Sequence, residues 1–238
     1  AALFNYNNVE RENGTTSIQD DRDRNEYMVS SNLGYEVMQS RSLYVAGSYS
    51  ERVHDEMIDS SAFNSRDSSD YRAGIGFNND KETSNLYFNF VIGYLNRDYE
   101  ADQLPDIDGV DVKIESILKL TEQDRVKINV GRDIKDSYST DNSGYIQTSA
   151  AIQYDRKIAT DLTAYAKLRY LNNDFETINT ATTLDREDNV YDIGVGLSYE
   201  IIEDLFANAD YGYRNRSSNE DDAEFDTHKV GVSMSYKF

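Results

Sequence analysis

The chain has 238 residues without cysteine, and its 24 Lys and Arg against 44 Asp and Glu give a formal net charge of −20 at pH 7. This charge disfavours a nucleic-acid partner, because a phosphate backbone requires a positive surface, and the lack of cysteine excludes disulfide scaffolds, thiolate metal sites and cysteine nucleophiles. The mean hydropathy of −0.73 excludes a helical membrane protein, since a spanning helix needs about 20 consecutive apolar residues.

The composition nevertheless predicts a folded chain with a single domain. The 19 Tyr and 9 Phe are far more than an acidic disordered tail would carry, and a single Pro leaves no proline-rich linker. We therefore expect one domain over residues 1–238. The chain opens with Ala1-Ala2 and no charged or apolar leader, which we expect of a mature form whose signal peptide has been removed.

Strict alternation of apolar and polar residues runs through the chain and predicts about twelve β-strands, each with one apolar and one polar face. The first segment, which contains Phe4 and Tyr6, has the weakest pattern, whereas the last alternates Val230, Val232 and Met234 with glycine and serine. The predicted strands cover residues 2–6, 27–37, 43–49, 71–77, 86–94, 110–120, 126–130, 148–154, 162–170, 191–199, 205–213 and 230–238.

The links between these segments alternate between short and long. Short links are expected over 39–42, 78–84, 121–124, 155–160 and 200–204. Long polar links are expected over 13–24, 54–70, 96–109, 135–144, 172–189 and 215–227. An antiparallel meander of this kind places all short turns at one end and all long loops at the other, as in outer-membrane barrels. We therefore predict an all-β, closed, antiparallel, up-and-down transmembrane barrel with short periplasmic turns, long extracellular loops and both chain ends in the periplasm.

Aromatic residues at the two ends of the apolar face indicate that this face meets lipid, because membrane-spanning barrels carry aromatic side chains at both interfaces. The predicted ring at the long-loop end consists of Tyr27, Tyr49, Tyr71, Tyr94, Tyr170, Tyr191 and Tyr213. The predicted ring at the short-turn end consists of Tyr35, Phe77, Tyr154, Tyr199, Tyr236 and Phe238. A soluble β-sandwich would explain the alternation, but neither the rings nor the segregated loop lengths.

The polar face carries charges that a dry core could not bury without a large desolvation cost, so we expect it to line a wet lumen. The predicted lumen-lining residues are Arg72, Asp111, Lys113, Glu115, Lys119, Lys127, Lys167, Arg169, Asp192, Asp210, Arg214 and Lys229. Mixed charges could select a sugar chain or an ion, or they could pair and fill the lumen. Since about 8 strands make a filled barrel and about 16 to 18 a wide channel, both interpretations stay open.

The end of the chain resembles the C-terminal signal of bacterial outer-membrane barrels. It reads Tyr236-Lys237-Phe238, with apolar residues at every second position before it. This resemblance implies that the barrel-assembly machinery reads Tyr236 and Phe238 as an assembly signal.

Short pieces over most of the chain also resemble the putative β-barrel porin type 2 family. The pieces are Asn7-Asn8-Val9, the stretch 106–133, Arg186-Glu187-Asp188 and the stretch 211–219. The resemblance implies a location in the bacterial outer membrane. It also implies a role in polysaccharide export, because genes of this family often accompany exopolysaccharide or capsule clusters.

Metal binding and catalysis have weaker support. The acidic loops 98–108 and 220–226 offer carboxylates to divalent cations, but their spacing lacks the order of a calcium loop, so we predict no metal site. His54 and His228 have no neighbouring arrangement of nucleophile and base. We therefore predict no catalytic residue, no cofactor and no enzymatic activity.

The most specific hypothesis is a passive outer-membrane conduit for export of an exopolysaccharide or oligosaccharide. The sugar chain would be held by weak contacts from Arg72, Lys113, Lys167, Arg169 and Arg214. Two alternatives stay open: a general diffusion porin for small solutes, and a non-conducting structural barrel whose acidic loops bind a surface partner. The expected partners are outer-membrane lipid and lipopolysaccharide, the barrel-assembly machinery and periplasmic polysaccharide-export proteins, and no nucleic acid.

Overall fold

The computed structural model describes residues 2–6, 24–54, 66–79, 85–137, 142–178 and 185–236, and for 2–6 it describes the backbone. The described residues form twelve β-strands and one short 3-10 helix, Asp221–Ala223. The strands are β1 (Ala2–Tyr6), β2 (Arg24–Met38), β3 (Arg41–His54), β4 (Ser68–Asn79), β5 (Leu86–Tyr99), β6 (Ile107–Lys119), β7 (Asp124–Asp136), β8 (Asn142–Lys157), β9 (Leu162–Thr177), β10 (Glu187–Ile202), β11 (Leu205–Ser218) and β12 (Phe225–Tyr236). No helix in these ranges is long and apolar enough to cross a membrane.

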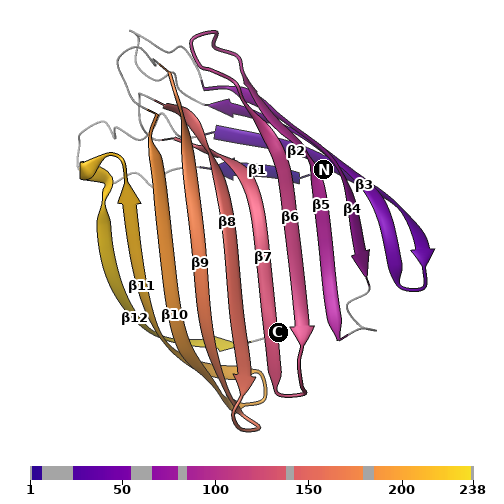
Figure 1. Ribbon diagram of the computed structural model, residues 1–238, viewed down its shortest axis with the longest axis vertical. Coiled ribbons are helices and arrows are strands. Elements are labelled where there is room, and N and C mark those ends of the chain that lie inside the picture. The colour runs from indigo at the N-terminus through magenta and orange to yellow at the C-terminus, as the bar shows by residue number, and fades with distance from the viewer. Residues whose placement is uncertain are drawn as a thin grey trace.

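All strands lie in one antiparallel sheet in which each strand pairs with its neighbours in the sequence, from β1 to β12. Figure 1 shows them side by side as a single, strongly curved sheet, with β2 and β3 at one end and β11 and β12 at the other. This arrangement confirms the predicted all-β, up-and-down topology. It agrees with the general tendency of strands that are consecutive in the sequence to lie next to each other in a sheet.

The sheet is open between its two edge strands, which corrects the prediction of a closed barrel. In the described part of the chain, the pairing order ends at β1 and β12 without joining them. The strand β1 has five residues and pairs only with the start of β2, so among the described residues the rest of β2 has no strand on that side. Outward side chains near this seam are more exposed: Leu33 and Val232 are 75% and 82% exposed, against 39% for Ile128 on the central strand β7.

The apolar face of the sheet points outward and stays exposed. Ile193, for example, is 51% exposed, where a soluble barrel would bury it. Tyrosines of neighbouring strands pack together at the long-loop end, with ring centroids 5.1 Å apart for Tyr49–Tyr71 and 5.2 Å apart for Tyr170–Tyr191. Such an apolar band between aromatic side chains suits lipid, and in a barrel of the predicted kind the segments between the two rings would be the membrane-spanning part.

The strands β6 and β7 separate toward the long-loop end. Their pairing stops at Lys113 opposite Gly131, although both strands continue. Beyond this point, four side chains form the buried apolar cluster of the described residues: Leu95, Ile107, Ile134 and Ile146. By alternation the first two face inward, on β5 and β6, and the last two face outward, on β7 and β8. The end of the β7–β8 hairpin therefore packs against the inner face of β5 and β6.

Two of the short turns have the same construction. Ser40 and Asp204 each adopt a left-handed backbone, with φ of 59° and 63°. The backbone N–H of each donates a hydrogen bond to a glutamate side chain four residues earlier: Ser40 to Glu36 at 2.8 Å, and Asp204 to Glu200 at 3.3 Å. A register shift follows each glutamate. Both turns thus combine a residue in the left-handed conformation with a hydrogen bond to a glutamate side chain four positions earlier.

The strands extend further toward the long-loop end than predicted. The predicted long link over 135–144 is wrong in length, because β7 runs to Asp136 and β8 begins at Asn142. Most of the predicted loops 13–24 and 54–70 lies outside the described residues. Beyond the tyrosines at the long-loop end, outward positions such as Asn96 and Asp98 are polar, so the apolar stripe that marks the outer face of a strand in the sequence ends there.

Candidate functional site

The inner face of β2 to β8 surrounds a cavity of about 630 Å³. On one wall, the Tyr44 hydroxyl donates a hydrogen bond to the side-chain oxygen of Asn89. Gly76 makes room for this tyrosine, since a Cβ atom there would lie 2.2 Å from a carbon of its ring. The cavity therefore offers an aromatic face beside hydrogen-bonding groups, the combination found in sites for organic ligands.

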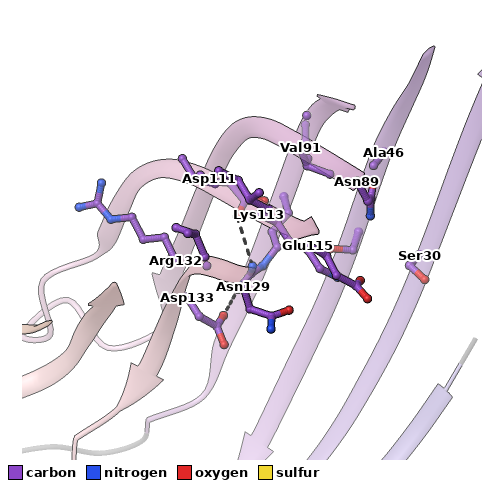
Figure 2. A pocket seen from close by; sticks show the side chains of 18 of the residues that line it. Ser30, Ala46, Asn89, Val91, Asp111, Lys113, Glu115, Asn129, Arg132 and Asp133 are labelled. Atoms are coloured by element: carbon purple, nitrogen blue, oxygen red, sulfur yellow. Dashed lines mark hydrogen bonds and ion pairs between the residues drawn. The ribbon is translucent and has the colours of Figure 1, made fainter. Parts of the chain in front are cut away.

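Charged side chains cross the middle of this cavity. The Arg72 guanidinium on β4 pairs with the Asp133 carboxylate on β7, and its Nη1 lies 3.6 Å from Asp111 Oδ1. Lys135 also pairs with Asp133. Lys113 is exposed and, in the described part of the chain, forms no ion pair. Figure 2 shows Asp111, Lys113 and Glu115 in a row along one strand, with Asp133 on the neighbouring strand.

A network of ion pairs lies toward the long loops from this cavity, where several of its members line an adjoining space. Arg97, only 1% exposed, donates from Nε to Asp70 Oδ1 at 2.7 Å and from Nη1 to Asp136 Oδ1 at 2.6 Å. Arg52 lies 2.7 Å from Asp70, and Arg24 lies 2.5 Å from Asp136. Because Arg24 is on β2 and Asp136 on β7, the network ties two distant strands of the sheet together across its inner face.

The tip of the β7–β8 hairpin is anchored to Arg66 just before β4, to β5 and to the link between β5 and β6. Arg66 donates from Nη1 to the carbonyl oxygens of Ser137 and Ser143, at 2.9 and 3.2 Å. The Tyr99 hydroxyl donates to the Ser143 carbonyl at 2.9 Å, and Ser143 Oγ donates to the Pro105 carbonyl at 3.1 Å. Burial raises the pKa of Tyr99, so its phenol stays neutral and keeps its donor hydrogen.

A second cavity, of about 400 Å³, lies on the inner face of β9 to β12. On the side of the long loops, Arg169 Nε donates to Asp192 Oδ2 at 2.7 Å and Arg214 Nε donates to Asp192 Oδ1 at 2.6 Å. Two guanidinium groups on one carboxylate leave one positive charge in excess. Lys167 and Lys229 line the same cavity, and neither forms an ion pair with a described residue.

The structure distributes the predicted lumen residues over these two cavities and their surroundings. The first cavity is lined by Arg72, Asp111, Lys113 and Glu115. The second is lined by Lys167, Arg169, Asp192, Arg214 and Lys229. Three predicted residues lie outside both: Lys127 pairs with Asp155 at 2.9 Å, Lys119 is exposed at the end of β6, and Asp210 lies one row closer to the short turns than the second cavity.

The loop-end network was not predicted from the sequence. Arg97, Asp70 and Asp136 all lie beyond the ends of the predicted strands 86–94, 71–77 and 126–130. The inward positions of β5 continue at every second residue, from Leu95 to Arg97 and Tyr99. This period of two past Tyr94 was the available signal that the strand continues. It could identify inward side chains, but not their partners on distant strands.

The two histidines lie apart from both cavities. His54 Nδ1 is 3.2 Å from Asp67 Oδ1 near the loop end. His228 lies on the exposed strand β12; its Nδ1 is 2.8 Å from the hydroxyl of Tyr211 on β11, and its Nε2 is 4.0 Å from Asp226. In the ranges that the structure describes, no three His, Asp or Glu side chains come together as a metal ion would require.

Comparisons with known proteins agree with a porin-type barrel. Among solved structures, the FrpB iron transporter from Neisseria meningitidis (F3-3 variant) is similar, with a TM-score of 0.54 and 8% sequence identity. The match covers 91% of this chain and 42% of the other, so this chain spans less than half the length of that structure, and the likeness concerns the fold alone. No curated protein matches the sequence.

The family comparison extends over the whole chain and confirms the resemblance seen in the sequence. The family described as Putative beta-barrel porin 2 matches residues 1–238. The match agrees with the curved antiparallel sheet and its apolar outer face. The chain belongs to the Putative beta-barrel porin 2 family.

Proposed function

We propose that the protein is a passive conduit through which a hydrophilic saccharide chain, an exopolysaccharide or oligosaccharide, crosses the outer membrane. The observation that carries this proposal is the composition of the inner face between the aromatic rings. It combines an inward tyrosine, Tyr44, with amide, hydroxyl and charged groups around an open cavity. Many weak polar contacts hold a moving chain without trapping it, because conduction requires binding that is weak at each site.

The basic side chains of this inner face are the contacts expected for the chain. They include Arg72 and Lys113 in the first cavity and Lys167, Arg169 and Arg214 in the second. The conduit also requires that the free edges of β1 and β12 find backbone partners, since unpaired N–H and C=O groups are costly in a bilayer. Closure at this seam is therefore part of the proposal.

The cellular setting of the conduit follows from the same reasoning. The apolar outer face contacts outer-membrane lipid and lipopolysaccharide, and the short turns and both chain ends face the periplasm. The barrel-assembly machinery recognises the terminal strand through Tyr236 and Phe238, and periplasmic export proteins deliver the polysaccharide. The protein carries out no chemical step and requires no cofactor.

A planar-bilayer recording of the refolded protein tests the proposal. We expect a steady single-channel conductance that falls when an oligosaccharide is added, because the chain occupies the lumen. Conductance that oligosaccharides leave unchanged would instead identify a diffusion porin for small solutes.

The loop-end ion pairs around Arg97 favour a second candidate, a non-conducting structural barrel, because they narrow the inner space at one end. A folded, membrane-inserted protein without conductance would support this candidate and refute the conduit. Heat-dependent migration in gel electrophoresis would establish that the inserted protein is folded.

A further inference from the structure

A row of four residues crosses the inner face of the last four strands. Lys167 on β9 lies opposite Gly194 on β10, Gly194 lies opposite Gly212 on β11, and Gly212 lies opposite Lys229 on β12. Adjacent strands are about 4.8 Å apart, so the two lysine backbones are separated by roughly 14 Å. Because each lysine has a flexible four-carbon stem, both ammonium groups can reach over the two glycines between them.

The two glycines leave open space on the inner face. A Cβ atom on Gly194 would find its nearest neighbour at 3.8 Å, and one on Gly212 would find it at 3.9 Å. The next glycine of β10 differs, since a Cβ atom on Gly196 would lie 2.5 Å from the ring of Tyr165. Gly194 and Gly212 are therefore the floor of a trough that no neighbouring side chain fills, with a lysine at each side.

Positive charge predominates around this trough. The next row toward the long loops contains Arg169, Asp192 and Arg214, with one positive charge in excess. The next row toward the short turns contributes one carboxylate, Asp210. Basic groups thus outnumber acidic ones here, although the chain as a whole carries −20. A basic patch between low-dielectric walls concentrates anions locally, even on an acidic protein.

We infer that this trough, called here the glycine trough (Lys167, Gly194, Gly212 and Lys229), binds the carboxylate groups of an acidic saccharide during its passage. The inference rests on the proposed conduit and names its substrate class. Lys167 and Lys229 make the contact because their charges are uncompensated, whereas Arg169 and Arg214 are held by Asp192. The cavity of about 400 Å³ is larger than a single small anion requires, which favours a saccharide unit over a free ion.

Block of single-channel current by charged and neutral sugars tests the inference. The probes are an oligogalacturonate and a maltooligosaccharide of equal length, added to the refolded full chain in a planar bilayer. We expect the acidic sugar to block at lower concentration and its block to weaken as salt is raised. In the double variant Lys167→Gln/Lys229→Gln, block by the acidic sugar should weaken by about tenfold or more, as expected for two lost charge-assisted contacts, while block by the neutral sugar should not change.

Two further variants separate charge from occupancy of the trough. Gly212→Leu keeps every charge and places bulk on the floor, where the backbone leaves room, so it should weaken block by the acidic sugar. Lys157→Gln removes a lysine at the short-turn end of β8, outside the trough, and should behave as the wild type. If Lys157→Gln weakened block by the acidic sugar as much as Lys167→Gln/Lys229→Gln does, the inference would be overturned. The loss of a positive charge outside the trough would then have the same effect as the loss of the two lysines that line it.

The remaining outcomes distinguish failure of the proposed binding at the glycine trough from failure of the proposed conduit. If both sugars block the conductance equally, in the wild type and in the variants, the glycine trough does not bind the acidic sugar, but the proposed conduit still holds. If the protein does not conduct, calorimetric titration of the micelle-bound protein with oligogalacturonate still tests the trough, and loss of binding in Lys167→Gln/Lys229→Gln would support it. Inorganic phosphate that competes as well as the acidic sugar would overturn the assignment to a saccharide.

Discussion

Replacing Arg97 by methionine should release the β7–β8 hairpin from the inner face of the sheet. Arg97 is 1% exposed and binds Asp70 and Asp136 with three hydrogen bonds, so its removal leaves two carboxylates short of a partner in a poorly hydrated site. Breaking a buried ion pair costs about 3 to 5 kcal/mol. Arg52 and Arg24 still face the two carboxylates, so we expect the lower end, about 3 kcal/mol.

Two measurements test this prediction for Arg97→Met. The free energy of unfolding, from urea titration in detergent micelles, should fall by the expected amount, and the single-channel conductance should rise because the hairpin no longer narrows the loop end. The matched control is Arg156→Gln, which removes an exposed pair with Asp124 at the short-turn end and should leave both quantities unchanged. If Arg97→Met behaved like this control, the loop-end network would neither stabilise the protein nor hold the β7–β8 hairpin against the inner face, and the reasoning would be refuted.

Three smaller predictions concern a turn, a close backbone approach and a titrating group. Ser40→Gly should raise the free energy of unfolding by about 0.5 to 1 kcal/mol, because Ser40 has φ of 59° and glycine adopts this conformation without steric cost; an unchanged urea midpoint would contradict this. Gly93→Ala should lower the free energy of unfolding by about 2 kcal/mol, since a Cβ atom there would lie 2.1 Å from the Ala73 carbonyl oxygen; Gly131→Ala, whose nearest neighbour would be at 3.5 Å, is its control in the same titration. Burial lowers the pKa of His54, which lies outside the membrane-spanning segments. His54 is therefore protonated near pH 6.5 in the unfolded chain but stays neutral at that pH in the folded chain. The free energy of unfolding should fall as pH drops through this value. His54→Gln should flatten the dependence of melting temperature on pH between 7 and 5, and an identical slope in the variant would refute the assignment.

The sequence determined which residues form strands and which face each strand presents. A period of two is a local property, since successive side chains of an extended chain point to opposite sides. The predicted segment 71–77, for example, lies within β4, and Tyr71 and Ile75 are exposed on its outer face while Arg72 points inward. The consecutive order of strands was also predictable from the sequence, because short links join antiparallel neighbours as hairpins and consecutive strands are usually adjacent.

The tertiary structure decided how far the strands reach and which of them meet across the inner face. Ile134 shows the limit, because alternation places it outward, yet it is buried against Leu95 and Ile107 where β6 and β7 have separated. The contact of Arg24 with Asp136 joins residues more than a hundred positions apart, and no local pattern encodes such a pairing. The open seam between β1 and β12 likewise involves two segments at opposite ends of the sheet, and no local pattern reports whether such segments pair. The alternation of neighbouring residues therefore set which side chains lie on each face of the sheet. The curvature of the sheet and its long-range contacts set the shape of the space that it surrounds.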